Sequence, residues 1–297
     1  FGHIRIHTFS VDDADAFVSE FVRLSEVLPQ EGLVIDVRGN GGGLIFAGER
    51  LLQVLTPKPI ETERTQFINT ALNLDIVRRN APSASIQGLD LDPWRASMEE
   101  SISTGAVYSR GYPITDKATA NGIGQRYQGP VALITDAKCY STTDIFAAGF
   151  QDHQIGPIIG VDGNTGAGGA NVWTHSLLRR LAGRNSPYGR LPGGANMRVA
   201  IRRTLRVLDR AGTPVEDLGV QPDYLHQTTR WMVTSTFWPL PPPNWPNCRC
   251  GHCAPKPSAR RMGTGRSQSK RRTCRGWMCI WTTARLVHST WKTERRS

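Results

Sequence analysis

Two segments about a hundred residues apart each have the pattern of a buried strand, a sharp turn and a helix. The first, GLVIDVRGNGGG, runs from Gly32 to Gly43, and the second, GPVALITDAKCYSTTDIFAAGFQD, runs from Gly129 to Asp152. Short apolar strands that lead directly into helices are typical of proteins in which helices cover a sheet. The pair therefore predicts an α/β layered domain.

Periodicity predicts the other main elements of this domain. We expect a helix over 11–28, with Ser10 as its N-cap, and a second helix over 44–55. The spacing further predicts a helix over 142–150. Strands are expected over 131–135, 157–161 and 197–208.

The two turns carry the residue types that acyl transfer needs. Ser141 opens the second helix, where free backbone amides and the positive end of the helix dipole stabilise negative charge. Three glycines, Gly41 to Gly43, allow close backbone approach in the first turn. Taken singly, Ser141 is better explained as a helix cap completed by Asp144, and the glycines as a plain tight turn.

Three more segments, GHIRIHTF, GVDGNTGAGGANVW and VEDLGVQPD, accompany these two in a fixed order. Together they resemble the tail-specific proteases, or C-terminal processing peptidases, over most of residues 1–226. The resemblance implies a crotonase-like ββα spiral and a serine endopeptidase that acts on polypeptides, with no cofactor and no metal. It makes Ser141 the nucleophile, and it assigns the oxyanion hole to the amide of Thr142 and to a loop amide, Gly42 first and Gly41 second.

The general base departs from the main branch of this family, which uses a Ser/Lys dyad. Ala167 occupies the lysine position, and Lys138 matches no position at which the family places a base. A smaller, tricorn-like branch uses Ser/His/Glu, with its glutamate just before a G-V-x-P-D signature. By that resemblance Glu216 is the candidate that orients a histidine. A surface carboxylate in a turn is its alternative interpretation.

The histidine of such a triad is left open by the sequence. Tricorn-like members carry it at the position of Arg5, which His3 and His7 flank on the same face of a strand, whereas chlamydial-type members carry it further upstream. Because the chain begins at Phe1, we read it as N-terminally incomplete. We expect an upstream histidine, with His7 as the fallback, and a chain that is inactive or nearly so by itself. His153 is expected to be a cation at the end of the nucleophile helix.

Composition divides the chain near residue 229. Of the 36 Lys and Arg residues, 14 lie between Thr228 and Ser297, together with only one of the 25 acidic residues, so that the remainder is slightly acidic. We expect a catalytic domain over 1–229 and a disordered basic tail, or a frame-shifted sequence, over 230–297. Within the domain, 58–126 is expected to be an irregular insertion with one helix near 94–101, placed to select substrates.

The tail allows two other interpretations. Five of its residues could form a zinc site, although their spacing matches no common finger: Cys248, Cys250, Cys253, Cys274 and Cys279. Basic runs with tryptophan could bind nucleic acid, which we rank lowest.

The main rival to the peptidase is a catalytically silent crotonase-like domain that binds a peptide or a small ligand. Ala167 and the open histidine favour this rival. The sequence has no apolar run of the roughly 18 residues that a membrane helix needs, so we expect no membrane partner. It leaves the compartment and the oligomeric state open.

Overall fold

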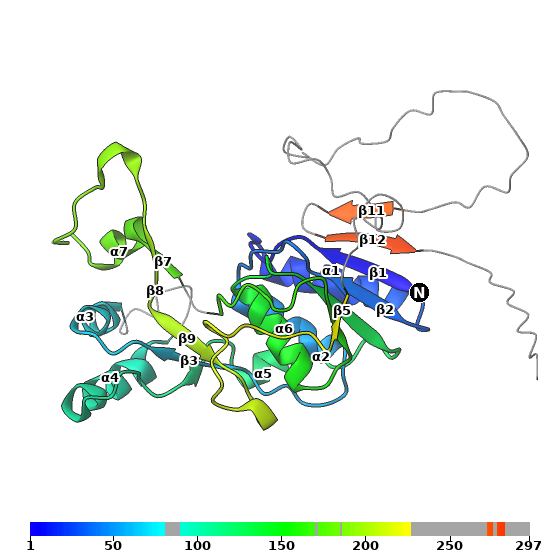
Figure 1. Ribbon diagram of the computed structural model, residues 1–297, viewed down its shortest axis with the longest axis horizontal. Helices are drawn as coiled ribbons and strands as arrows, with labels where there is room; N and C mark the ends of the chain where they lie inside the picture. The colour runs from blue at the N-terminus through cyan, green and yellow to red at the C-terminus, as the bar shows by residue number, and fades with distance from the viewer. Residues whose placement is uncertain (81–89, 170–171, 185, 227–271, 276–277, 283–297) are drawn as a thin grey trace, which may run out of the picture.

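The computed structural model describes residues 1–80, 90–169, 172–184, 186–226, 272–275 and 278–282. It is a mixed α/β structure whose larger part is built on a seven-stranded sheet of order β10-β6-β5-β2-β1-β12-β11 (Figure 1). The strands are β1 (Gly2–Ile6), β2 (Leu33–Asp36), β5 (Val131–Thr135), β6 (Ile158–Gly160), β10 (Tyr224–Leu225), β11 (Arg272–Arg275) and β12 (Met278–Thr282).

The central strands of this sheet are parallel and in register. Leu33 of β2 pairs with Gly2 of β1 on one side and with Val131 of β5 on the other. The carboxyl ends of these strands therefore meet at one edge of the sheet. In open α/β sheets that edge is where functional sites are built.

Three helices connect these strands: α1 (Ala14–Val27), α2 (Ile45–Val54) and α6 (Thr142–Asp152). Successive strands are added in one direction across the sheet, so right-handed crossovers place the three helices on the same face. In agreement, α2 packs against both α1 and α6. All eleven residues of α6 are buried, which makes it the central helix of the fold.

The first helix begins later than the sequence suggested. The side chain of Asp13, not Ser10, caps α1 by accepting a hydrogen bond from the Ala16 amide at 2.9 Å. Ser10 does not begin the helix because its neighbour Phe9 pairs with the glycine loop. The Phe9 amide donates to Gly42 O at 3.0 Å, and Phe9 O accepts from the Leu44 amide. The expected helix over 44–55 and strand over 131–135 are confirmed by α2 and β5.

A smaller second lobe lies beside this sheet, to the left in Figure 1. A three-stranded sheet of order β4-β3-β9 and a two-stranded sheet of β7 and β8 form its framework. Its elements, with those leading to and from it, are β3 (Arg64–Phe67), α3 (Ala71–Asn80), α4 (Asp92–Thr104), β4 (Tyr112–Pro113), α5 (Lys117–Ala120), β7 (Val172–Thr174), α7 (His175–Leu181), η2 (Pro192–Gly194), β8 (Arg198–Ala200), β9 (Arg202–Leu205) and η3 (Leu208–Arg210).

The second lobe has a hydrophobic core of its own. Phe67, Trp94 and Trp173 meet edge to face and are almost fully buried, and the Trp94 indole donates to Thr65 O at 2.7 Å. The helix expected near 94–101 is confirmed by α4. The rest of 58–126 is not irregular, since it supplies two strands and two further helices whose apolar partners lie far away in the sequence.

Two short parts of the tail are among the described residues. β12 pairs antiparallel with β1, where Met278 faces Ile6, and β11 pairs with β12. The Met278 side chain is buried in the main core. Of the proposed zinc ligands, Cys248, Cys250 and Cys253 lie outside the described residues, while Cys274 and Cys279 are opposite each other in the β11–β12 pair. The boundary expected between residues 229 and 230 lies outside the described residues and stays a prediction.

Candidate active site

Ser141 lies at the carboxyl edge of the sheet, between β5 and α6, in an unusual backbone conformation. Its φ and ψ are 56° and −122°, outside the regions that residues with a side chain ordinarily adopt. Its hydroxyl makes no capping hydrogen bond, although Ser141 is the N-cap residue. Ser141 is therefore held in a strained turn without performing the structural task that a cap serine usually performs.

The glycine loop lies directly against this turn. A Cβ placed on Gly42 would be 2.7 Å from Ser141 Cβ, 2.6 Å from Tyr140 O and 2.8 Å from Thr142 N. The φ of Gly42 is 95°, which also favours glycine. Gly42 is thus required for the two turns, a hundred residues apart in sequence, to come together.

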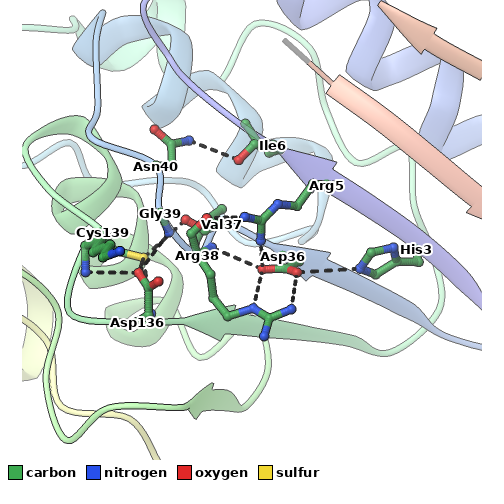
Figure 2. Close-up of polar contacts among 11 residues, drawn as sticks. His3, Arg5, Ile6, Asp36, Val37, Arg38, Gly39, Asn40, Asp136 and Cys139 are labelled. Carbon is green, nitrogen blue, oxygen red and sulfur yellow. Dashed lines mark hydrogen bonds and ion pairs between the residues drawn. The ribbon is translucent and has the colours of Figure 1, made fainter. Parts of the chain in front are cut away.

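Four interactions join the turn that contains Ser141 to the glycine loop. Asp136 Oδ1 accepts from the Gly39 amide at 2.9 Å, and the Cys139 thiol contacts Val37 O at 3.2 Å (Figure 2). Tyr140 donates its amide to Asn40 O at 3.0 Å. The Thr142 hydroxyl donates to Gly43 O at 2.7 Å.

The backbone amides near Ser141 differ in their availability. The Gly42 amide donates to Asn40 Oδ1 at 2.9 Å, so its hydrogen is engaged in this structure. Gly41 is exposed, and a Cβ added to it would meet nothing within 4 Å. Thr142 is the first residue of α6, so its amide has no acceptor within the helix.

Asp144, one turn into α6, ties Ser141 to the loop that contains Ala167. Its carboxylate accepts from the amides of Ala167 at 3.2 Å and Gly168 at 3.1 Å, and from the Ser141 amide and the Thr165 side chain. Burial raises the pKa of Asp144 to about 6, against the opposing effect of these hydrogen bonds. Asp144 therefore completes the backbone half of a capping box while fixing a second loop.

Glu216 lies beside the same loop. Its neighbour Val215 packs against Gly169, and its other neighbour Asp217 donates its amide to Ala167 O at 2.9 Å. Glu216 itself is half-buried. The structure thus brings Glu216 to the loop that Asp144 holds, although it does not test the catalytic role expected of Glu216.

A buried ion-pair network holds Arg5 of β1. Arg5 contacts Asp36, which also accepts from Arg38 Nε at 3.0 Å and Arg38 Nη2 at 2.7 Å (Figure 2). Burial would raise the pKa of Asp36, but the hydrogen bonds and charges of Arg38 and Arg5 outweigh it and hold that pKa below its usual value. His3 Nε2 is 4.0 Å from Asp36 Oδ2.

The other histidines have different surroundings. His7 is exposed at the end of β1. His153 follows α6, but it is not the expected cation. Its Nε2 accepts from the Glu61 amide at 2.9 Å, and its Nδ1 lies 2.8 Å from Gly149 O. Burial lowers the pKa of this imidazole, which is therefore neutral and structural.

Sequence reasoning missed the residues that brace the two turns. Asn40 and Asp136 were not singled out, yet each connects the two turns next to Ser141. Asp36 and Arg38, which pair with each other beside Arg5, were also missed. One signal was present: Asn40 and Asp136 are side-chain acceptors two residues before an amide that they bind, Gly42 and Lys138, which is an Asx-turn pattern.

Within the described parts of the chain, no group of three or more His, Cys, Asp and Glu side chains is arranged to hold a metal. Likewise, none of the helices in those parts has the length and apolar character needed to cross a membrane.

The chain belongs to peptidase family S41, whose sequence model matches residues 1–226. Its fold is similar to that of mature CPAF complexed with lactacystin, with 19% identity and a TM-score of 0.51, over 75% of this chain and 46% of that one. A second structure of mature CPAF gives 19% identity, a TM-score of 0.52 and coverages of 74% and 45%. The photosystem II D1 C-terminal processing protease gives 19% identity, a TM-score of 0.43 and coverages of 76% and 42%.

The chain spans slightly less than half the length of these three proteins. A search among curated proteins gave no match.

Proposed function

We propose that this chain carries the nucleophilic centre of a serine endopeptidase that cleaves polypeptides through an acyl-enzyme at Ser141. In this mechanism Ser141 Oγ attacks the carbonyl carbon of the scissile peptide and gives its proton to a base. The base then protonates the leaving amine as the C–N bond breaks, and water hydrolyses the resulting ester. Membership of family S41 supports this class of reaction.

The observation that carries the proposal is the backbone of Ser141. A non-glycine residue at φ 56° and ψ −122° costs of the order of 1–3 kcal/mol. A serine that served only as a cap would not need this conformation, and its hydroxyl would make the capping hydrogen bond that Ser141 lacks. The strain is accounted for if it presents Oγ at the head of α6.

Two amides are proposed to stabilise the oxyanion. The Thr142 amide opens α6 next to Ser141 and lacks an acceptor within the helix. From the glycine loop we retain Gly42 as the first candidate and Gly41 as the second, which gains weight because Asn40 engages the Gly42 amide. If the Gly42 amide leaves Asn40 when substrate binds, it becomes free to donate to the oxyanion.

The base is proposed to be a histidine in a Ser/His/Glu arrangement, with Glu216 as its orienting carboxylate. Arg5 is paired with Asp36 and is not itself a base at neutral pH. An upstream histidine, or His7 as the fallback, therefore remains the proposed base. Glu216 is supported by its place beside the Ala167 loop.

A catalytically silent binding domain is the second candidate. Two residue identities favour it: Ala167 stands at the lysine position of the Ser/Lys branch, and Arg5 stands at the histidine position of the tricorn-like branch. This candidate predicts a folded chain whose Ser141 does not react.

Labelling with a serine-directed fluorophosphonate separates the two. We expect labelling of the wild-type chain to be slow but measurable, because oxyanion stabilisation persists without a base. It should be lost in Ser141→Ala and retained in Ser103→Ala, which alters an exposed serine of α4. His7→Ala then tests the fallback base. Equal labelling of Ser141→Ala and wild type would refute the acyl-enzyme proposal.

A further inference from the structure

Two glutamates are buried next to each other where the second lobe meets helices α2 and α6. Glu49 lies on α2 and is 2% exposed, and Glu63 lies one residue before β3 and is 4% exposed. The Glu63 amide donates to Glu49 Oε1 at 3.1 Å. These residues belong to different lobes, so their contact is part of the junction between them.

This junction is close to the proposed site. Gly48, which precedes Glu49, lies against the first turn of α6, since a Cβ on Gly48 would be 2.8 Å from Thr142 Cγ2. A change at Glu49 therefore reaches the residue next to Ser141 through one packing contact.

The carboxyl oxygens of the pair are poorly provided with donors. Glu49 Oε2, Glu63 Oε1 and Glu63 Oε2 are buried and have no hydrogen-bond partner among the described residues. Two ionised carboxylates in such surroundings would be strongly disfavoured by desolvation and by mutual repulsion.

The charged groups around the pair do not neutralise it. The charges of Asp152 and Asp144 of α6 act on Glu63 and add to the repulsion, and the charge of Arg206 opposes it. Arg206, however, is engaged by Asp152, with Nη2 2.5 Å from Oδ1 and Nε 3.2 Å from Oδ2, and by Gln151 at 2.9 Å. The Thr115 hydroxyl lies beside Glu49 and opposes the rise of its pKa.

The pKa values of both glutamates are raised, as their burial without donors requires. Burial raises the pKa of Glu49 from 4.5 to about 7. Burial, followed by the charge of Glu49, raises the pKa of Glu63 well above its usual value, and Arg206 only partly opposes this.

We propose that Glu49 and Glu63 share a proton and form a pH-sensitive latch that holds the second lobe against α2 and α6. In the latched state the carboxyl O–H of one glutamate donates to a carboxylate oxygen of the other. Loss of that proton to water as the pH rises leaves two adjacent negative charges, which loosen the junction behind Ser141. The latch is independent of whether Ser141 is reactive.

Thermal unfolding of the full chain as a function of pH tests the latch. The folded pKa of Glu49 lies above the unfolded value, so its contribution to stability is complete below about pH 4.5 and is lost as the pH rises to about 7. Glutamine cannot ionise. The Tm of Glu49→Gln, relative to wild type, should therefore increase over this range and level off above it. That of Glu63→Gln should also increase from about pH 4.5 and should level off only above the raised pKa of Glu63.

Glu31→Gln, at an exposed position, is the matched control and should follow the wild-type curve at every pH. Curves of Glu49→Gln and Glu63→Gln that also stay parallel to wild type would overturn the proposal. So would a Tm increase of the wild type with Ca²⁺ or Mg²⁺ that both variants lose, because the pair would then hold a cation instead of a proton.

Infrared spectroscopy of the wild-type chain keeps the proposal testable should the variants not fold. The infrared band of a protonated carboxyl group should persist at pH values well above the ordinary pKa of glutamate. It should disappear only near or above pH 7. Disappearance of all such signal below about pH 5 would contradict a shared proton.

Discussion

The carboxylate of Asp144 binds the amide of Gly168 at 3.1 Å, which links the helix that begins after Ser141 to the loop over 164–168, the expected place of a lysine base in a Ser/Lys dyad. In this chain that loop contains Ala167, yet its conformation is kept by Asp144 and by the Gly166 amide, which donates to Cys139 O at 2.7 Å. The loop thus has a structural role here that does not depend on a lysine.

Asp144→Asn tests this role. The asparagine side chain keeps one oxygen but directs an NH₂ group at backbone amides that are themselves donors, which leaves buried donors unpaired. We expect a loss of about 1–3 kcal/mol in the free energy of unfolding and a large loss of fluorophosphonate labelling. Urea denaturation and labelling of the same sample measure both. Asp162→Asn, which changes a more exposed carboxylate that binds the Ala137 amide, is the control.

Substitution of Ser141 by alanine and by glycine separates reactivity from strain. Both variants should lose labelling, since both lose the hydroxyl. Only glycine should relieve the positive φ, so Ser141→Gly should be about 1 kcal/mol more stable than Ser141→Ala. Thermal and urea unfolding compare them. A glycine variant no more stable than the alanine variant would show that the backbone at Ser141 is not strained.

Gly42→Ala and Gly41→Ala form a matched pair in the glycine loop. Alanine at 42 would place its Cβ within 3 Å of Tyr140 O and Ser141 Cβ at a positive φ, whereas alanine at 41 meets nothing within 4 Å. We expect Gly42→Ala to lose several kcal/mol of stability, about the cost of overpacking plus strain, and Gly41→Ala to lose well under 1 kcal/mol. Equal stabilities would contradict the close approach of the two turns.

Asp36→Asn tests the ion-pair network of Arg5, Asp36 and Arg38. Removal of the carboxylate leaves Arg5 and Arg38 facing each other, and we expect a loss of about 3–5 kcal/mol at neutral pH. Because the folded pKa of Asp36 is lowered from 3.8, its stabilisation is present above that pH and is lost as the pH falls through the folded value. The deficit of the variant should therefore shrink in acid.

Asp15→Asn is the control for Asp36→Asn. Asp15 pairs with Arg50 at 2.6 Å, but its side chain is 84% exposed. We expect its loss to be at most about 1 kcal/mol. A similar cost for both variants would mean that burial adds nothing to the Asp36 network.

Local patterns were sufficient to predict the central strands of the larger sheet, but not β10, β11 or β12. Val131–Thr135 alternates buried and half-buried residues between two turn signals, and Leu44–Leu55 has an apolar helical stripe that ends before Pro57, so both were predicted from the chain alone. Ser141 and its glycine partner were predicted because strand, turn and helix follow one another without interruption. These features depend on residues that are close in sequence.

Features that depend on distant partners were not predicted. The second lobe is defined by Phe67, Trp94 and Trp173, which meet only after the chain has folded. The state of His153 depends on the Glu61 amide, 92 positions away. Arg5 was considered only as the residue at an expected histidine position, because no local sequence pattern indicates its pairing with Asp36.

The helix that follows Ser141 has no face toward solvent. Natural variation therefore has little freedom there, since almost every substitution along its length disturbs packing. Divergence in specificity between related chains should accumulate in the glycine loop, in the Ala167 loop and above all in the separately packed second lobe. A laboratory effort to redirect this scaffold would do best to randomise those regions and leave the eleven residues after the serine untouched.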